Sequence, residues 1–269
     1  MKALKPIHDE SYSELNELLK WFAHFGPIPI LIGGWAVYLY NSYLGSIDID
    51  IVGESLEGSF ADVVEQYERA HGYEFLSKDP LGLEIVSRKP VVRGGRVLGH
   101  MEIDACTVED PGPSRFNEDE SKRLPYSLCL IDQYRHQVEL SADSKCYLPC
   151  KSLLLLYKLK AARDRSYDLR IGQATLPAKR VDFLKSKLTK DLADIVALMD
   201  PAPASHLIND SLNPEILGKI ISEFSLGFAL DTVRDLPNNA EALSLYNPNA
   251  RPSDVQAWLK NSFPLDTHF

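Results

Sequence analysis

Hydrophobic and polar positions follow one pattern up to about residue 150 and another beyond it. In the first part, short apolar runs stand between glycine, proline and polar residues, which predicts strands mixed with helices. The predicted strands are 28–32, 48–52, 73–77, 83–92 and 96–108, and the predicted helices are 11–24, 35–43 and 59–71. Gly94 and Gly95 mark a hairpin turn, and the charged, proline-containing segment 109–122 marks a loop.

Beyond residue 150 the apolar residues recur at helical spacing. This pattern predicts helices beginning near Leu153 and at 181–199, 203–209, 213–225, 226–235, 239–246 and 252–262. The polar stretch 164–178, with Gly172 and Pro177, should separate the first two of these helices. We therefore expect an α+β protein, with a mixed-sheet domain and flanking helices over residues 1–150 and an all-helical domain over 151–269.

A glycine pair and two carboxylates lie close together in the first part of the chain. Gly33 and Gly34 open the predicted helix at 35–43, and such glycines leave N-terminal amides free to bind an anion. Asp48 and Asp50 share one face of the following strand, about 7 Å apart by the strand rise. Two neighbouring acids among apolar residues repel each other unless a cation neutralises them, so this pattern favours a metal site.

These residues resemble the signature of the DNA polymerase β-type nucleotidyltransferases, in which a glycine pair at a helix start precedes Asp-x-Asp on a strand. The matching residues are Gly33, Gly34, Ser46, Asp48 and Asp50. The resemblance implies that the glycines and Ser46 lie against a nucleoside triphosphate (NTP). It also implies that the two aspartates bind Mg²⁺ with a third carboxylate from a later strand.

The strand at 96–108 offers that third carboxylate. Glu102 and Asp104 share one of its faces, with Met101, Ile103 and Ala105 on the other. We select Asp104, because this family usually ends the strand with a hydrophobic-Asp-hydrophobic step. Two Mg²⁺ ions about 3.5–4 Å apart would then be held by the three aspartates.

The second part of the chain resembles the abortive-infection AbiEii-like nucleotidyltransferase toxins of type IV toxin–antitoxin systems. Their helical half has a lysine on one helix and Lys-Asp-x-x-Asp on a later one, matched here by Lys158 and by Lys190, Asp191 and Asp194. The resemblance implies that Lys158 stabilises developing charge and that Lys190 and Asp191 orient the nucleotide. A salt-bridged helix surface is the alternative interpretation. Leu44 departs from the family pattern, which often has arginine there.

Charge is unevenly distributed along the chain. The net charge is −9, which argues against indiscriminate nucleic-acid binding. Residues 151–190 nevertheless contain eleven Lys and Arg against three Asp, a net charge of +8. This block is suited to a polyphosphate or an RNA, and equally to a solvated helix surface.

Composition restricts the setting of the protein. The chain has 269 residues, of which 45% are apolar, and no run of about 18 apolar residues that would span a membrane. Four cysteines, at 106, 129, 146 and 150, form no Cys-x-x-Cys motif. We expect a cytoplasmic protein with reduced cysteines. The rings of Trp35, Tyr38 and Tyr40 either stack on a base or, more commonly for such spacing, belong to the core.

The expected activity is transfer of a nucleoside monophosphate from an NTP to an acceptor hydroxyl, with release of pyrophosphate. The toxin resemblance implies a tRNA 3′ end as the acceptor and a cognate antitoxin as a partner. Fold and metal site do not choose an acceptor, so a small molecule, such as an antibiotic or metabolite, and a protein remain alternatives. A catalytically silent module that binds a nucleotide or a partner is the alternative from another class.

Overall fold

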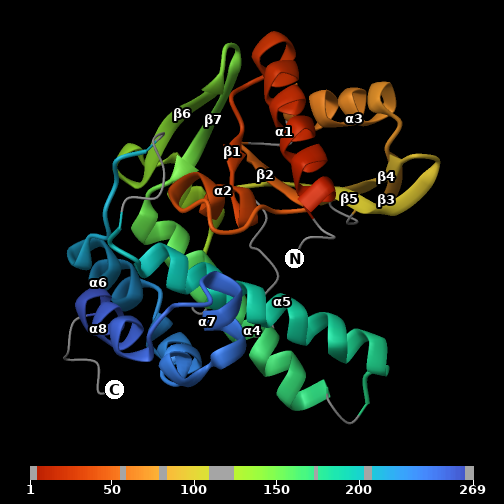
Figure 1. The fold of residues 1–269 in the computed structure, drawn as a ribbon. Helices are drawn as coiled ribbons and strands as arrows, with labels where there is room; N and C mark the ends of the chain where they lie inside the picture. Colours follow the sequence, from red (N-terminus) through yellow and green to blue (C-terminus); the bar gives the residue numbers. More distant parts are fainter. Residues whose placement is uncertain are drawn as a thin grey trace. The chain divides into compact units, whose positions relative to one another are not determined.

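The computed structural model of the chain describes residues 5–54, 59–78, 84–108, 124–172, 175–202 and 208–263 (Figure 1). Contacts divide these residues into two compact units. The first contains the described residues up to 108, together with 125–150 and Ile208. The second contains Leu124, 151–172, 175–202 and 209–263. The predicted loop at 109–122 lies outside the described residues.

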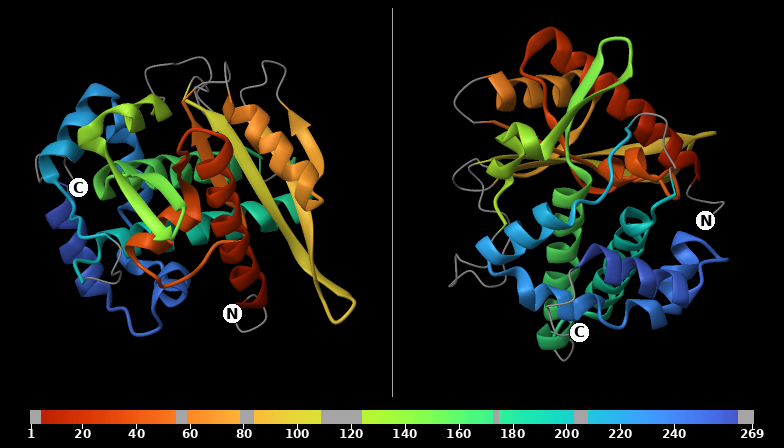
Figure 2. Two further views of the ribbon diagram at one scale, coloured as in Figure 1. Left: turned by 90° about the horizontal axis from the view of Figure 1, so that it is seen from above. Right: turned by 90° about the vertical axis from the view of Figure 1, so that its left-hand side faces the viewer.

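Seven strands of the described residues form one mixed sheet in the first unit, in the order β3-β4-β5-β2-β1-β7-β6 (Figure 2). Strand β2 is parallel to β5 and β1 is parallel to β7, while the other neighbours are antiparallel. Their bounds are β1 (Ile30–Leu31), β2 (Ile49–Gly53), β3 (Glu74–Lys78), β4 (Glu84–Arg93), β5 (Arg96–Thr107), β6 (Arg135–Ser141) and β7 (Ser144–Pro149). The α+β class and the mixed sheet predicted from the sequence are confirmed.

Three helices accompany this sheet: α1 (Lys5–Phe25), α2 (Gly33–Tyr40) and α3 (Ser59–His71). Helix α1 buries Leu15, Leu18, Leu19 and Phe22, the i, i+3, i+4, i+7 stripe of its sequence. It packs against α3 and against β5 and β7, and Figure 1 shows α1 and α3 on the same side of the sheet. The predicted helix at 59–71 is confirmed with the same bounds.

The hairpin of β6 and β7 was not predicted from the sequence. Its turn contains Ala142 and Asp143, with Asp143 in the left-handed region at φ 64°, so no glycine marks it. Two short 3₁₀ helices, η2 (Tyr126–Leu130) and η3 (Asp132–Tyr134), precede the hairpin. All four cysteines are buried thiols that form no disulfide, as predicted.

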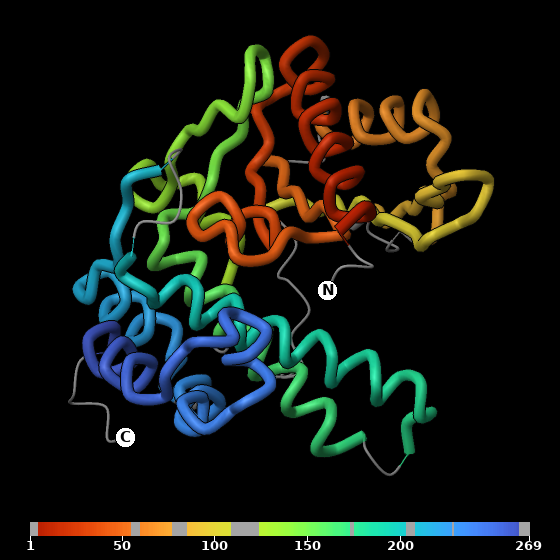
Figure 3. Tube along the Cα trace, viewed as in Figure 1, coloured from red at the N-terminus to blue at the C-terminus, as the bar shows by residue number. Residues whose placement is uncertain are grey.

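The second unit is helical over its described residues (Figure 3). Its long helices α4 (Lys151–Gly172) and α5 (Ala178–Met199) pack along each other. Shorter helices follow, namely α6 (Pro214–Glu223), η4 (Leu226–Val233), η5 (Leu236–Asn238), α7 (Ala240–Tyr246) and α8 (Pro252–Ser262). No helix among the described residues is long and apolar enough to cross a membrane.

Three expectations for the second unit need correction. Helix α4 does not end at residue 164 but continues to Gly172, because charged side chains in that stretch form ion pairs that helical spacing permits, such as Lys160 with Asp164. Segment 226–233 is 3₁₀ helix, entered from Ser225 in the left-handed region. Of the predicted helix at 203–209, only Ile208 and Asn209 lie within the described residues, and neither is helical.

Candidate active site

Two of the predicted metal ligands lie directly opposite each other on neighbouring strands. In the parallel pairing of β2 with β5, Asp50 is in register with Asp104, and Ile49 with Ile103. Both isoleucines are fully buried, whereas both aspartates are partly exposed. Adjacent strands are about 4.8 Å apart, so the two carboxylates start from neighbouring positions on one face of the sheet.

Asp48 lies immediately before β2, two residues from Asp50 and partly exposed. Ile47, one residue earlier, packs against a small buried cluster that includes Ile7 of α1. Ile47 and Asp48 lie in a bend, and the strand begins only at Ile49, so strand alternation does not fix the face of Asp48 relative to Asp50. That Asp48 and Asp50 share one face stays a prediction.

Gly33 lies against the carboxylate of Asp50. Its φ is +68°, in the left-handed region, and a Cβ built on it would overlap the Asp50 side chain, including Cγ and Cβ. The neighbouring Ile32 N–H donates to the Asp50 carbonyl oxygen at 3.0 Å. Backbone conformation and close approach therefore both require glycine at position 33. The amino end of α2 is thereby placed beside Asp50, and the buried Gly34 is its second residue.

Ser46 is buried, at 6% exposure, in the segment that leads to Asp48. Two hydrogen bonds hold this segment in place. The Ser11 hydroxyl donates to the Ile47 carbonyl oxygen at 2.8 Å, and the Trp35 indole Nε1 donates to the Ser11 oxygen at 3.0 Å. The segment is thus fixed both to α1 and to α2.

The three aspartates do not form a closed metal site with their present rotamers. Within the described residues, no three His, Cys, Asp or Glu side chains lie close enough together to hold a metal ion. Carboxylate oxygens are nevertheless the ligands that Mg²⁺ prefers, and the register places Asp50 and Asp104 opposite each other. The residues fit Mg²⁺ in donor chemistry and backbone position, and side-chain rotation is what a closed site would require.

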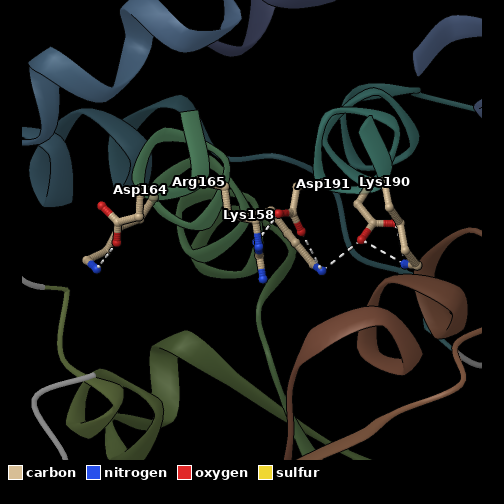
Figure 4. A network of polar contacts seen from close by, with 7 residues as sticks. Lys158, Asp164, Arg165, Lys190 and Asp191 are labelled. Carbon is tan, nitrogen blue, oxygen red and sulfur yellow. Dashed lines mark hydrogen bonds and ion pairs between the residues drawn. The ribbon is translucent and has the colours of Figure 1, made fainter. Parts of the chain in front are cut away.

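The predicted lysine and aspartates of the second unit meet between α4 and α5 (Figure 4). Lys158 Nζ lies 2.7 Å from Asp194 Oδ2 and 3.4 Å from Asp191 Oδ1. Lys190 Nζ lies 3.1 Å from Asp194 Oδ2, and Arg165 pairs with Asp191. We call these five residues the α4–α5 ion network.

Burial distinguishes this network from the salt-bridged surface that the sequence left open. The side chain of Asp194 is 0% exposed, that of Asp191 6% and that of Lys158 11%. Charges this far from water must be paired, because an uncompensated buried charge costs several kcal/mol. Asp194, which the sequence placed beside Asp191 but to which no role was given, is the most buried member and binds two lysines. Arg165 was missed altogether.

The basic block of residues 151–190 divides into buried and exposed cations. Four are buried and paired or near acids: Lys151, Lys158, Lys160 and Arg163. Burial lowers the pKa of Lys151, although Asp200 and Asp210 oppose the shift. The exposed cations are concentrated at the start of α5, where Arg180 lies 5.1 Å from the ring centre of the exposed Phe183.

Tyr40 belongs to the core, since it is 6% exposed and its hydroxyl donates to the Pro149 carbonyl oxygen at 2.8 Å.

No protein-family model matches the chain, and no curated protein matches it. Among solved structures, the chain is similar to the crystal structure of an antigenic nucleotidyltransferase-like protein from Paracoccidioides brasiliensis. The two share 15% sequence identity over 87% of this chain and 94% of that chain, with a TM-score of 0.42.

Proposed function

We propose that this protein is a metal-dependent nucleotidyltransferase, which moves a nucleoside monophosphate from an NTP to an acceptor hydroxyl. The observation that supports this most is the register of Asp50 with Asp104, together with Gly33 against the Asp50 carboxylate. A carboxylate pair beside the amino end of a helix combines ligands for a divalent ion with amides that attract phosphate.

Asp48, Asp50 and Asp104 are the residues that we propose to bind Mg²⁺, with two ions in the complete site. Bound there, Mg²⁺ would neutralise phosphate charge and polarise the phosphoryl oxygens.

The backbone of Gly33 and Gly34 and the hydroxyl of Ser46 are proposed to orient the β- and γ-phosphates. Amides at the amino end of α2 carry partial positive charge and suit this task. With the NTP so held, the acceptor oxygen bonds to the α-phosphorus while the bond to the β-phosphate oxygen breaks, and pyrophosphate leaves.

For Lys158, Lys190 and Asp191 we propose a role in nucleotide binding, supported by the toxin resemblance. Lys190 is the most accessible of the three, with 23% of its side chain exposed. Lys158 is held by two carboxylates, so contact with a phosphate would require exchange of one of these partners. Its contribution would be charge stabilisation rather than proton transfer.

We propose that the acceptor is a tRNA 3′ end. We also propose that the protein acts as a toxin and has a cognate antitoxin as its partner. The exposed cations of α5 beside the exposed ring of Phe183 support an RNA acceptor, since phosphates and bases bind such surfaces. A small-molecule acceptor is the second candidate, favoured by an aromatic pocket in the first unit. A silent nucleotide-binding module is favoured only by the carboxylates that do not converge.

The test is incubation of the purified protein with Mg²⁺, total tRNA and each of the four α-³²P-labelled NTPs. Label on tRNA that disappears with EDTA and with Asp50→Asn would support the proposal. Glu102→Gln is the matched control, because Glu102 is partly exposed and lies two residues before Asp104 on β5. It should retain transfer.

Three results would contradict parts of this proposal. Equal labelling by Asp50→Asn and the unmodified protein would exclude the carboxylate site. Release of pyrophosphate without labelled tRNA would exclude the tRNA acceptor and favour a small molecule or a protein. Absence of both products with all four NTPs would favour the silent module.

A further inference from the structure

An aromatic pocket of about 590 Å³ lies within the first unit, apart from the carboxylate pair. Three segments surround it: the first turns of α1, the helix α2 and the chain that follows α2. The residues that line it include Lys5, Asp9, Tyr12, Trp35, Tyr38 and Gly45. Ligand pockets for small molecules are typically 300–1,000 Å³ and mostly apolar, with a few polar groups at chosen places.

Three aromatic rings form one wall of this pocket. The Trp35 ring centre lies 5.1 Å from that of Tyr12 and 5.2 Å from that of Tyr38, and the two tyrosine centres are 5.9 Å apart. Trp35 is 2% exposed, whereas both tyrosines are half-buried and present part of each ring. The rings are tilted by 48° to 85°, so they support one another by edge contacts and leave ring faces turned elsewhere.

Apart from the tyrosines, the ionisable side chains that line the pocket are the basic Lys5 and His8 and the acidic Asp9. Lys5 and Asp9 are exposed and opposite in sign, and burial raises the pKa of the Tyr12 phenol, which therefore stays neutral. A triphosphate would find no cationic cluster here, and an ammonium ligand would find no acidic one. The chemistry favours an uncharged planar ring with hydrogen-bonding edges.

The pocket wall is connected to the segment that carries Asp48. Trp35 is joined through Ser11 to the carbonyl of Ile47, as described above. A Cβ built on Gly45 would lie 3.0 Å from Trp35 Cη2, so the chain touches the indole one residue before Ser46. A ligand on the aromatic wall would therefore act on the same short segment that positions Asp48.

We propose that this pocket binds a planar heteroaromatic ring of the nucleobase class. Such a ring could belong to the NTP or to an acceptor, and its chemistry is the same in both cases. Every base has a π face that stacks on aromatic side chains, and removal of one stacking partner typically costs about 1–3 kcal/mol, or roughly 5- to 150-fold in affinity. Binding of the ring itself requires neither Mg²⁺ nor the carboxylates.

The experiment uses the full chain and the four uncharged nucleosides adenosine, guanosine, cytidine and uridine, without Mg²⁺. Saturation-transfer NMR and calorimetry measure their binding. Tyr38→Leu should weaken the best nucleoside by about tenfold, and Ser42→Trp should do the same by filling the cavity from its exposed rim. Phe75→Leu, which removes an exposed aromatic ring of β3 outside the pocket lining, is the matched control and should leave binding unchanged.

No nucleoside binding, or equal binding by the unmodified protein, Tyr38→Leu and Ser42→Trp, would overturn the inference. Addition of Mg²⁺ and NTP then separates the two sources of the ring. Displacement of the nucleoside assigns the pocket to the NTP base, and simultaneous binding assigns it to an acceptor.

Failure of this inference is distinguishable from failure of the proposed transfer reaction. Asp50→Asn should abolish transfer and keep nucleoside binding, since Asp50 is not among the pocket residues. Transfer without nucleoside binding would overturn only the inference that the pocket binds a nucleobase. Nucleoside binding that is lost in Tyr38→Leu, in a protein without transfer activity, would support the pocket alone.

Discussion

Gly33 and Asp50 are in such close contact that no other residue fits at position 33. The left-handed φ of +68° and the overlap of a Cβ with the Asp50 carboxylate act together, whereas most glycines in turns meet only the first condition. This contact ties the amino end of α2 to the second carboxylate of Asp-x-Asp.

Gly33→Ala should therefore lower the free energy of unfolding by more than the conformational penalty, which is about 1–2 kcal/mol for a left-handed alanine. It should also abolish nucleotidyl transfer by displacing Asp50. Gly94→Ala is the matched control, because Gly94 has φ +58° and nothing within 4 Å of a Cβ. Urea denaturation measures the free energy of unfolding of both variants. Equal losses would show that the contact with Asp50 is harmless.

Mg²⁺ should raise the melting temperature of the unmodified protein, because an ion that binds only the folded state stabilises it by mass action. Asp104→Asn should remove most of this increment, whereas Glu102→Gln should keep it. Thermal unfolding followed by circular dichroism with EDTA and with Mg²⁺ measures the difference. An increment that survives in Asp104→Asn would place the ion elsewhere.

Asp194→Asn should cost about 3–5 kcal/mol of stability, since it leaves the ammonium of Lys158 and part of that of Lys190 under-compensated in a buried place. Asp254→Asn removes the partner of Arg251, whose side chain is 75% exposed, and should leave the free energy of unfolding nearly unchanged. Chemical denaturation compares the two. Similar small costs would mean that the α4–α5 ion network contributes little.

Stability should fall as pH rises above about 4.5 through the contribution of Glu68. Burial raises the pKa of this carboxyl above its ordinary value of 4.5, although the hydrogen bond from Ser87 Oγ at 2.7 Å opposes the shift. The folded state then holds the proton to a higher pH than the unfolded state, so ionisation destabilises the fold.

Glu68→Gln should consequently increase the free energy of unfolding at neutral pH and flatten its decline between pH 4.5 and 7. Asp62→Asn on the same helix is the control, because Asp62 is exposed and is not among the groups that shift the Glu68 pKa. Denaturation curves across this pH range measure both variants. An unchanged slope in Glu68→Gln would assign the pH dependence to other groups.

Much of the first unit was predictable because alternation is a strong signal. In β2 and β5, apolar residues at every second position specified which face the aspartates occupy, and the register of Asp50 with Asp104 agrees with that assignment. The register itself was not predictable, since it depends on contacts between segments about 50 residues apart. The hairpin of β6 and β7 was missed because Asp143 replaces the expected glycine in its turn.

The α4–α5 ion network shows a different boundary of prediction. Helical spacing placed Asp191 and Asp194 on one face of α5, and this is confirmed by their shared contact with Lys158. The spacing of residues on a helix does not show how deeply their side chains are buried. The sequence therefore could not distinguish a buried ion network from a solvated, salt-bridged surface. The convergence of the three aspartates depends on side-chain rotamers, which the sequence pattern does not specify.

Strand β1 is the shortest strand of the sheet, yet it joins β2 on one side to β7 on the other. A ribosome completes Ile30–Leu31 more than 100 residues before it reaches Ser144–Pro149. During that interval one edge of β1 has no strand partner and exposes unpaired amides and carbonyls to other nascent chains. A fragment that ends before Ser144 would leave this edge of β1 without its strand partner, even though it contains every carboxylate of the proposed metal site.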